Sequence, residues 1–175
     1  MRTLLSVLAI IMGLTTCAQA GDDAPFSFLG VTFNDASGTK GWKFQILNKA
    51  PIPGHPELTL VVGTPSFGSG VFVLVTQRNG KNIGLIYTFP FTQSRQIEAG
   101  LIQSYNSPAN MHETTWQTAY GQMVQGVEMI WETSAGEMVF DDRSEDLSQG
   151  KIVINPTEAL DGNAARRGIP TTNFH

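Results

Sequence analysis

Residues 70–90 read GVFVLVTQRNGKNIGLIYTFP, and this stretch decides how the rest of the chain must fold. Two apolar runs flank Asn79-Gly80, a dipeptide that suits a type I′ hairpin turn because both central positions of that turn require positive φ. The first run, 71–75, is apolar at five successive positions, so both of its faces must be covered and it must lie inside a sheet. With the turn centred at Asn79-Gly80, the predicted cross-strand partners are Arg78 with Lys81, Leu74 with Leu85 and Phe72 with Tyr87.

Stretches with strand-like patterning occur on both sides of this hairpin. Residues 42–46 and 127–132 alternate apolar with polar side chains, which is the pattern of a strand with one face in water. Residues 26–33 are rich in aromatic and β-branched side chains, and we expect them to form a hairpin with 42–46. The prolines within 51–56 predict a stiff connection, because proline has no backbone N–H to donate to a ladder.

Between residues 94 and 124 the patterning supports both helix and strand. Ile97, Leu101 and Tyr105 recur at helical spacing, whereas 101–106 fits a strand equally well. Further along this stretch, the aromatic side chains fit one face of either element. The sequence therefore leaves the secondary structure of this segment open.

The number and spacing of the predicted strands indicate the fold class. Turn signals separate about eight to ten short strands, which is typical of a sandwich or a barrel. We expect a mostly β chain, folded as an antiparallel sandwich or barrel-like single domain with one short helix packed on the sheet. An α+β fold is the alternative.

The first 20 residues have the features of an export signal. Arg2 precedes a largely apolar run over 4–14, and Ala18 and Ala20 supply the small residues that a signal peptidase recognises. The apolar run is shorter than the roughly 20 residues that a membrane-spanning helix needs. We therefore expect residues 1–20 to be a cleaved signal peptide.

The leader also sets the expected domain limits and the location of the protein. We predict a single β-rich domain over 21–155 and a flexible tail over 156–175, with no transmembrane segment. The protein is expected to be periplasmic or secreted, or, as the alternative, a lipoprotein anchored at Cys17. Because Cys17 is the only cysteine, the chain after the leader can form neither a disulfide nor a thiolate metal site.

The charge distribution excludes some classes of partner. The net charge is −4 and no basic stripe is present to neutralise phosphates, so nucleic acid is not an expected partner. The densest acidic segment is FDDRSEDL at 140–147, whose carboxylates are the hard oxygen ligands that calcium prefers. This segment lacks the spacing and the glycine of a calcium loop, and a solvated turn is the alternative interpretation. The candidate metal ligands are Asp141, Asp142, Glu145 and Asp146.

Aromatic residues and a histidine supply the candidate ligand-binding side chains. Tryptophans can stack on sugars, although in alternating strands they more often belong to the core. The sequence HETT at 112–115 begins like a zinc-binding helix but carries Trp116 where the second histidine is needed. Glu113 and Asp141 are a conceivable carboxylate pair for glycoside cleavage, but nothing in the sequence brings them together. The candidate ligand-binding residues are Trp42, Trp116, Trp131 and His112.

Catalytic machinery is sparse in this sequence. After the leader the chain has no cysteine, and it has three scattered histidines and no Gly-x-Ser-x-Gly motif, so we assign no catalytic residue and no cofactor. We expect an exported envelope protein that acts as a non-enzymatic binding module for a protein or small-molecule ligand. An acid-residue or calcium-dependent hydrolase acting on envelope polysaccharide is the alternative.

Overall fold

The computed structural model describes residues 25–35, 38–65, 72–118, 120–144, 147–155 and 158–159. The predicted leader, and the predicted tail apart from Glu158 and Ala159, lie outside these residues. Among the described residues, no helix has the length and apolar character needed to cross a membrane. The described elements are, in chain order, β1 (Ser27–Phe28), β2 (Val31–Thr32), β3 (Phe44–Ile52), β4 (His55–Pro65), β5 (Val73–Arg78), β6 (Lys81–Pro90), the 3-10 turn η1 (Phe91–Gln93), α2 (Ser94–Tyr105), β7 (Asn110–Gln117), β8 (Met123–Thr133), β9 (Gly136–Asp141) and β10 (Gln149–Ile154).

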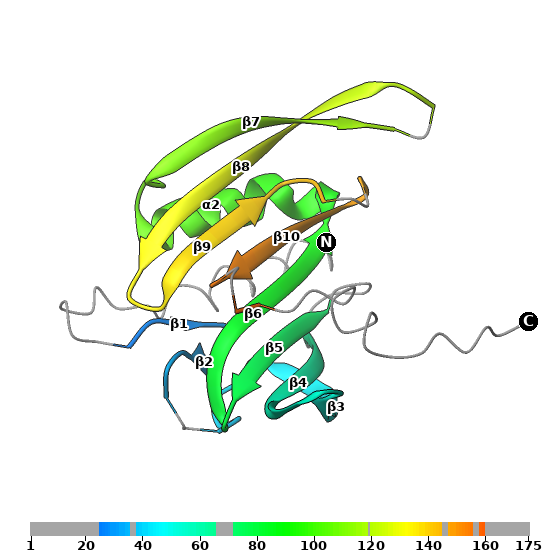
Figure 1. The fold of residues 1–175 in the computed structure, drawn as a ribbon. Helices are drawn as coiled ribbons and strands as arrows, with labels where there is room; N and C mark the ends of the chain where they lie inside the picture. The colour runs from blue at the N-terminus through cyan, green and yellow to red at the C-terminus, as the bar shows by residue number, and fades with distance from the viewer. Residues whose placement is uncertain are drawn as a thin grey trace, which may run out of the picture.

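Eight of these strands form one antiparallel sheet in the order β3-β4-β5-β6-β10-β9-β8-β7. Two four-stranded meanders build it, one before α2 and one after, and the last strand returns to pair with β6 at the centre (Figure 1). The sheet is open, because β3 and β7 lie at opposite ends of this order. The prediction of a mostly β, antiparallel fold is confirmed. Of the two predicted architectures, the sandwich-like one fits, because the sheet does not close into a barrel.

The central hairpin forms where the sequence predicts it. Asn79 and Gly80 have φ values of 51° and 80°, the left-handed conformation that a type I′ turn requires, and Arg78 lies opposite Lys81. β5 lies between β4 and β6, and its first five residues are buried. The predicted interior position of this strand is therefore confirmed.

A β-bulge at Ile83 changes the register of this hairpin by one residue. Gln77 pairs with Asn82 and Thr76 pairs with Gly84, which leaves Ile83 without a partner on β5. One extra residue in one strand reverses which face each later side chain occupies, and apolar patterning does not reveal it. The observed pairs are Val75 with Leu85, Leu74 with Ile86 and Val73 with Tyr87, in place of the predicted Leu74–Leu85 and Phe72–Tyr87.

Residues 26–33 do not form the predicted hairpin with 42–46. They fold back on themselves as β1 and β2, joined at Leu29 and Gly30, whose φ values are 51° and 75°. A Cβ at position 30 would clash with the carbonyl oxygen of Gly41, so only glycine fits there. The turn at Leu29 and Gly30 therefore divides this aromatic stretch into two short strands, in place of the single strand that its composition predicts.

The β3–β4 hairpin extends through the stretch that is predicted as a stiff connection. Pro51 belongs to β3 and pairs with Thr59 of β4. Proline is tolerated at that position because β3 is an edge strand and needs no donor on its outer side. The connection itself is a tight turn at Pro53 and Gly54, where Gly54 has a φ of 82°.

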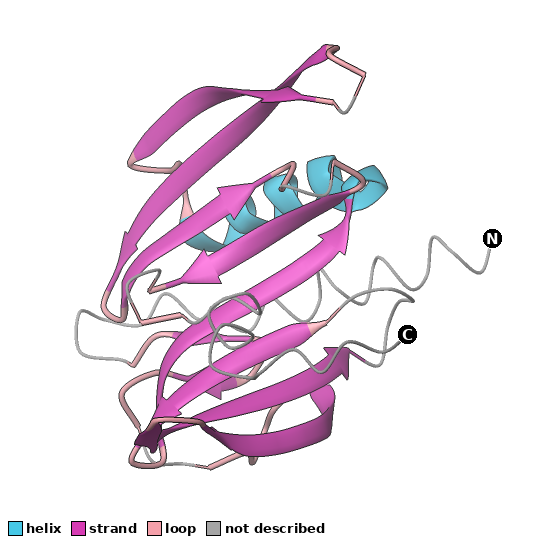
Figure 2. Ribbon diagram, turned by 45° about the vertical axis from the view of Figure 1, so that its right-hand side comes forward, coloured by secondary structure: helices cyan, strands magenta, loops and turns pink. Residues whose placement is uncertain are grey.

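Helix α2 and the β1–β2 hairpin form a second layer against one face of the sheet, which we call the inner face (Figures 1 and 2). Of the two alternatives that the sequence leaves open for this segment, the helix is correct: Ile97 and Leu101 are fully buried in the core between helix and sheet. Tyr105 donates a hydrogen bond to the carbonyl oxygen of Ser27 over 3.4 Å and so joins the helix to β1. The strand alternative for 101–106 is wrong.

The inner face is closely packed around Phe89. Its ring stacks on Phe140 with ring centroids 5.7 Å apart and an interplanar angle of 10°. It also lies over Gly150 of β10, where a Cβ would come within 2.4 Å of a ring carbon. Glycine is therefore required at position 150 because the aromatic ring occupies the space of a side chain.

The opposite face of the sheet, which we call the outer face, carries an apolar row that crosses six neighbouring strands. Each member lies directly opposite the next, so their side chains share one face. Leu74 and Ile86, at the centre of the row, are each 8% exposed. The row consists of Val62, Leu74, Ile86, Val153, Val139 and Ile130.

The chain crosses the outer face directly after β10. The side-chain amide of Asn155 donates to the carbonyl oxygen of the bulged Ile83 over 2.8 Å. Glu158 then pairs with Arg78, with 2.6 Å between Oε2 and a guanidinium nitrogen. A Cβ at Gly84 would lie 2.6 Å from the backbone nitrogen of Ala159, so glycine at this position admits the crossing chain.

The second ambiguous stretch is resolved as strand. β7 and β8 pair over eight consecutive residues without a register shift. β9 pairs only with the later part of β8, from Glu128 onward, so the earlier part of the β7–β8 hairpin extends beyond β9 as a two-stranded ribbon (Figure 2). Tyr120, near the tip of this ribbon, is 95% exposed.

Candidate functional site

A row of polar side chains crosses the outer face beside the apolar row. Its members lie opposite one another on β6, β10, β9, β8 and β7, so they project from the same face of the sheet. Their order brings two predicted candidates, Asp141 and His112, into one row. The polar row consists of Thr88, Lys151, Asp141, Glu128 and His112.

Asp141 is the most buried ionisable residue of this row, at 7% exposure. Lys151 of β10 lies 3.4 Å from its Oδ2 and forms an ion pair with it. Burial raises the pKa of the Asp141 carboxyl above its ordinary value, and the nearby Glu128 and Asp142 carboxylates raise it further. Lys151 acts in the opposite direction and stabilises the charged form.

Asp142 is the first residue after β9, and it continues the hydrogen bonding to β8 beyond the end of that strand. Its backbone N–H donates to the carbonyl oxygen of Val127 over 3.1 Å, and its Oδ1 accepts the Val127 N–H over 2.8 Å. A carboxylate therefore replaces the backbone carbonyl that another strand residue would supply. This contact turns the Asp142 side chain toward β8, next to Gly126.

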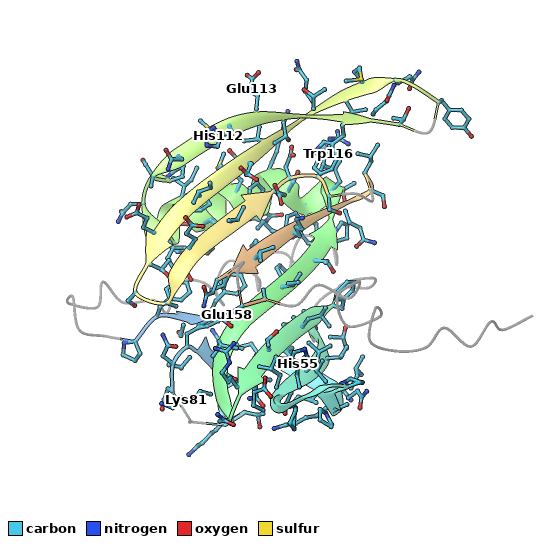
Figure 3. The ribbon with its side chains drawn as sticks, viewed as in Figure 1. His55, Lys81, His112, Glu113, Trp116 and Glu158 are labelled. Carbon is cyan, nitrogen blue, oxygen red and sulfur yellow. The ribbon has the colours of Figure 1, made fainter. Side chains whose placement is uncertain are left out.

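Three polar side-chain atoms surround Gly126 of β8, two from β7 and one from Asp142, which follows β9. A Cβ at this position would lie 2.7 Å from Oδ1 of Asp142, 2.9 Å from Oγ1 of Thr114 and 3.4 Å from Nε1 of Trp116. The Trp116 nitrogen is shielded from solvent and has no hydrogen-bond partner among the residues that the structure describes. In Figure 3, Trp116 lies on the β9 and β10 side of the β7–β8 ribbon.

An unbonded indole N–H is a notable feature of this cluster. A buried donor without a partner costs about 1–3 kcal/mol, and native structures contain few of them. Half-buried Trp116 thus combines an aromatic ring with an uncommitted donor, next to the Thr114 hydroxyl and the Asp142 carboxylate. These groups, with the polar row, form what we call the outer-face cluster.

The three tryptophans do not gather at one site. Trp131 is buried on the inner face, where its Nε1 donates to the carbonyl oxygen of Asn106 over 3.0 Å. Trp42 packs beside Phe44, with ring centroids 4.9 Å apart, against the core. Of the predicted aromatic candidates, the structure therefore brings only Trp116 to the outer-face cluster.

The predicted metal ligands are only partly described. Glu145 and Asp146 lie outside the described residues, and Asp141 and Asp142 have the partners given above. Within the described ranges, no group of three or more histidine, cysteine, aspartate or glutamate side chains is arranged to hold a metal ion. His55 is distant in the fold from this segment, since it begins β4, where its Nδ1 lies 3.5 Å from Glu57.

The conceivable catalytic pair of Glu113 and Asp141 is separated by the sheet. Glu113 lies opposite Val127, on the inner side of the ribbon, whereas Asp141 lies opposite Glu128 on the outer face. Figure 3 shows Glu113 pointing away from the body of the sheet. Glycoside cleavage by two carboxylates requires both to flank one bond, so this pair does not meet the geometry.

Thr114, Gly126 and Lys151 belong to the cluster but are not among the residues predicted from the sequence. Lys151 carries a detectable signal, because it is a charged residue at the start of the short apolar strand KIVI. Thr114 and Gly126 carry none, since their role depends on the β7–β8 register. Comparisons with protein-family models, with curated proteins and with solved structures found no match for this chain.

Proposed function

We propose that this chain is an exported, non-enzymatic binding module whose ligand contacts the outer-face cluster. The proposed ligand is a polyhydroxylated, sugar-like molecule. The observation that carries the proposal is the shielded, unbonded N–H of Trp116 beside the Thr114 hydroxyl and the Asp142 carboxylate.

The chemistry of these groups favours hydroxyl-rich ligands. An indole N–H only donates, a carboxylate only accepts, and a threonine hydroxyl does both. A sugar hydroxyl can satisfy each of these groups because it donates and accepts. An aromatic side chain with a few convergent polar groups is also a typical composition for a small-molecule site. Binding would give the Trp116 N–H an acceptor and so remove the cost of leaving it unpaired.

Support for export comes from the amino-acid sequence. Residues 1–20 have the charged start, the apolar run and the small-residue cleavage motif of a leader. After cleavage the chain has no cysteine, so its stability in an oxidising compartment depends on no disulfide. The envelope is also where polysaccharides and their fragments are available as ligands.

Intrinsic fluorescence tests this proposal on protein recovered from the periplasmic fraction, whose first residue is expected to be Gly21 by mass spectrometry. Chitotriose and maltotriose, titrated to about 10 mM, are the probes. We expect a saturable change in tryptophan emission with at least one of them, because Trp116 is half-buried in the cluster. Trp116→Phe should abolish the change, whereas the matched variant Trp42→Phe should retain it.

Two results would contradict the proposal. One is the absence of any emission change with either sugar over the whole titration. The other is a saturable change that persists in Trp116→Phe, which would place the ligand elsewhere on the molecule. Near-ultraviolet circular dichroism of both variants checks that each remains folded.

A further inference from the structure

We propose that the outer edge of β7, which pairs with no strand among the described residues, is a self-pairing interface. Two copies of the chain would join antiparallel along Asn110–Gln117 and so form one continuous sheet. This inference concerns assembly and does not depend on the ligand proposed above.

The backbone groups that point away from the sheet along β7 follow from two hydrogen bonds. At the ribbon tip, the N–H of Thr118 donates to the carbonyl oxygen of Gln122 over 2.8 Å. On the other side of β8, the N–H of Asp142 donates to the carbonyl oxygen of Val127. The backbone N–H and C=O of Val127 therefore point toward β9, and those of its two neighbours in β8 point toward β7. In an antiparallel ladder, successive residues direct both backbone groups to alternate sides. The residues of β7 with outward N–H and C=O groups are therefore Met111, Glu113, Thr115 and Gln117, and all four are exposed.

The two edges of the sheet are protected to very different degrees. β3 carries Pro51, Lys49 and two register shifts, which are features that discourage pairing with another strand. β7 has no proline, lysine or arginine and no register shift over its eight pairs with β8. It also exposes Met111, which is 63% exposed. A long, regular, unprotected edge is a template for strand addition.

The charge of β7 favours a second copy as the strand that is added. Glu113 is its only carboxylate, and His112 is its only basic residue, so β7 lacks the lysines or arginines that would select an acidic partner. A two-fold axis at Glu113 would set two carboxylates against each other, whereas an axis at Thr114 avoids this repulsion. The second arrangement pairs Thr114 with Thr114, Glu113 with Thr115, His112 with Trp116 and Met111 with Gln117 of the other copy.

This arrangement also has a consequence for the outer face. His112, Thr114 and Trp116 of β7 project to that face, so the outer-face clusters of the two copies would lie side by side. Because one strand from each copy is a small contact compared with standard interfaces, we expect a dimer that dissociates in the micromolar range.

Disulfide trapping tests both the interface and its register. In a Cys17→Ser background with the leader retained in the gene, Thr114→Cys places one thiol on the proposed two-fold axis. Gln125→Cys, exposed on β8 of the same ribbon, is the matched control. We expect mild oxidation to convert Thr114→Cys into a covalent dimer at least about tenfold faster than Gln125→Cys, because only position 114 meets its own copy. Equal rates would overturn the register.

Sedimentation velocity from about 1 to 300 μM tests the association itself. The unmodified chain should shift from monomer to dimer over this range. Thr115→Pro removes an outward N–H without removing a bond to β8, and it should raise the dissociation constant by at least about tenfold. Thr115→Val keeps the N–H and should still dimerise. A chain that stays monomeric throughout, or a dimer that Thr115→Pro leaves unchanged, would overturn the proposal.

Discussion

Two glycines in the second half of the sheet face aromatic side chains on opposite faces. On the inner face, Gly150 lies under the ring of Phe89, and the nearest atoms to a Cβ would be two ring carbons and the carbonyl oxygen of Asp141. On the outer face, Gly126 lies among Trp116, Thr114 and Asp142, and the nearest atoms would be the polar ends of their side chains. The same residue type thus leaves room for apolar packing on one face and for polar groups on the other.

The difference shows how the two faces divide their tasks. Phe89 is fully buried and stacked on Phe140, so the contact between Phe89 and Gly150 consists of close apolar packing. Trp116 is half-buried, and its indole N–H has no hydrogen-bond partner among the described residues. The inner glycine therefore serves stability, and the outer glycine borders the surface to which we assign binding.

Gly150→Ala is expected to produce the largest effect of the substitutions that probe this comparison. The added methyl group would overlap the Phe89 ring and a backbone oxygen within 2.7 Å, and neither has room to move in the core. We expect the free energy of unfolding in urea to fall by about 3 kcal/mol. A loss below about 0.5 kcal/mol would show that the inner face is not closely packed at this point.

A double-mutant cycle separates this overlap from a general cost of changing Gly150. Phe89→Leu removes the ring that the new methyl group would meet. The double variant Phe89→Leu/Gly150→Ala should therefore lose less stability than the sum of the two single losses, by about 1 kcal/mol or more. Strict additivity would locate the cost of Gly150→Ala in the backbone instead.

Gly126→Ala is expected to cost less, although its Cβ also has close neighbours. Those neighbours are side-chain ends. Thr114 and Trp116, on the β7–β8 ribbon, can rotate away, and the Asp142 carboxylate can shift by weakening its 2.8 Å bond to the Val127 N–H. We expect a loss of about 1 kcal/mol in urea unfolding, together with a changed near-ultraviolet circular dichroism signal from Trp116. A loss as large as that of Gly150→Ala would mean that the two faces are equally rigid.

The parts of the fold that were predictable from the sequence depend on local signals. Asn79-Gly80 specifies its turn through the conformation of two residues. The spacing of Ile97, Leu101 and Tyr105 fits the observed helix α2, but the same stretch also allowed a strand. The pairing of β10 with β6 joins distant parts of the chain, and the short apolar run of β10 fits several partners. The bulge at Ile83 could not be predicted either. It appears only in the pairing register of β5 and β6, and the apolar pattern of the sequence does not specify that register.

The candidate site was predictable as a set of residues and not as an arrangement. His112, Trp116 and Asp141 are each conspicuous by type, but their common face follows from the order and register of β7 to β9. Asp142 lies beyond β9 and reaches this face through the bond that its Oδ1 accepts from the Val127 N–H. Trp131 is equally conspicuous and lies on the inner face, since it is an odd number of residues away from Glu128 along β8. Whether a tryptophan belongs to the core or to the site therefore depends on the parity of its position in the strand.

The smallest expected effect concerns pH and the outer face alone. Burial raises the pKa of Asp141 above its ordinary value, so the folded chain holds this proton more tightly than the unfolded chain does. The carboxyl therefore contributes stability at low pH, and this contribution is lost as the pH rises from the ordinary aspartate pKa through the raised one. Asp141→Asn does not titrate. The unfolding free energy of the unmodified chain minus that of Asp141→Asn should therefore fall across this acidic window.

Urea unfolding at closely spaced pH values from about 3.5 to 7 measures this difference. Lys151→Met provides a second check. Removing the ammonium group takes away the interaction that lowers the pKa of Asp141, so this pKa should rise further. In that variant the fall should extend to higher pH. A difference that is independent of pH in both cases would mean that Asp141 is as well solvated as an exposed carboxylate. The outer face would then lack the partial burial that distinguishes it from an ordinary polar surface.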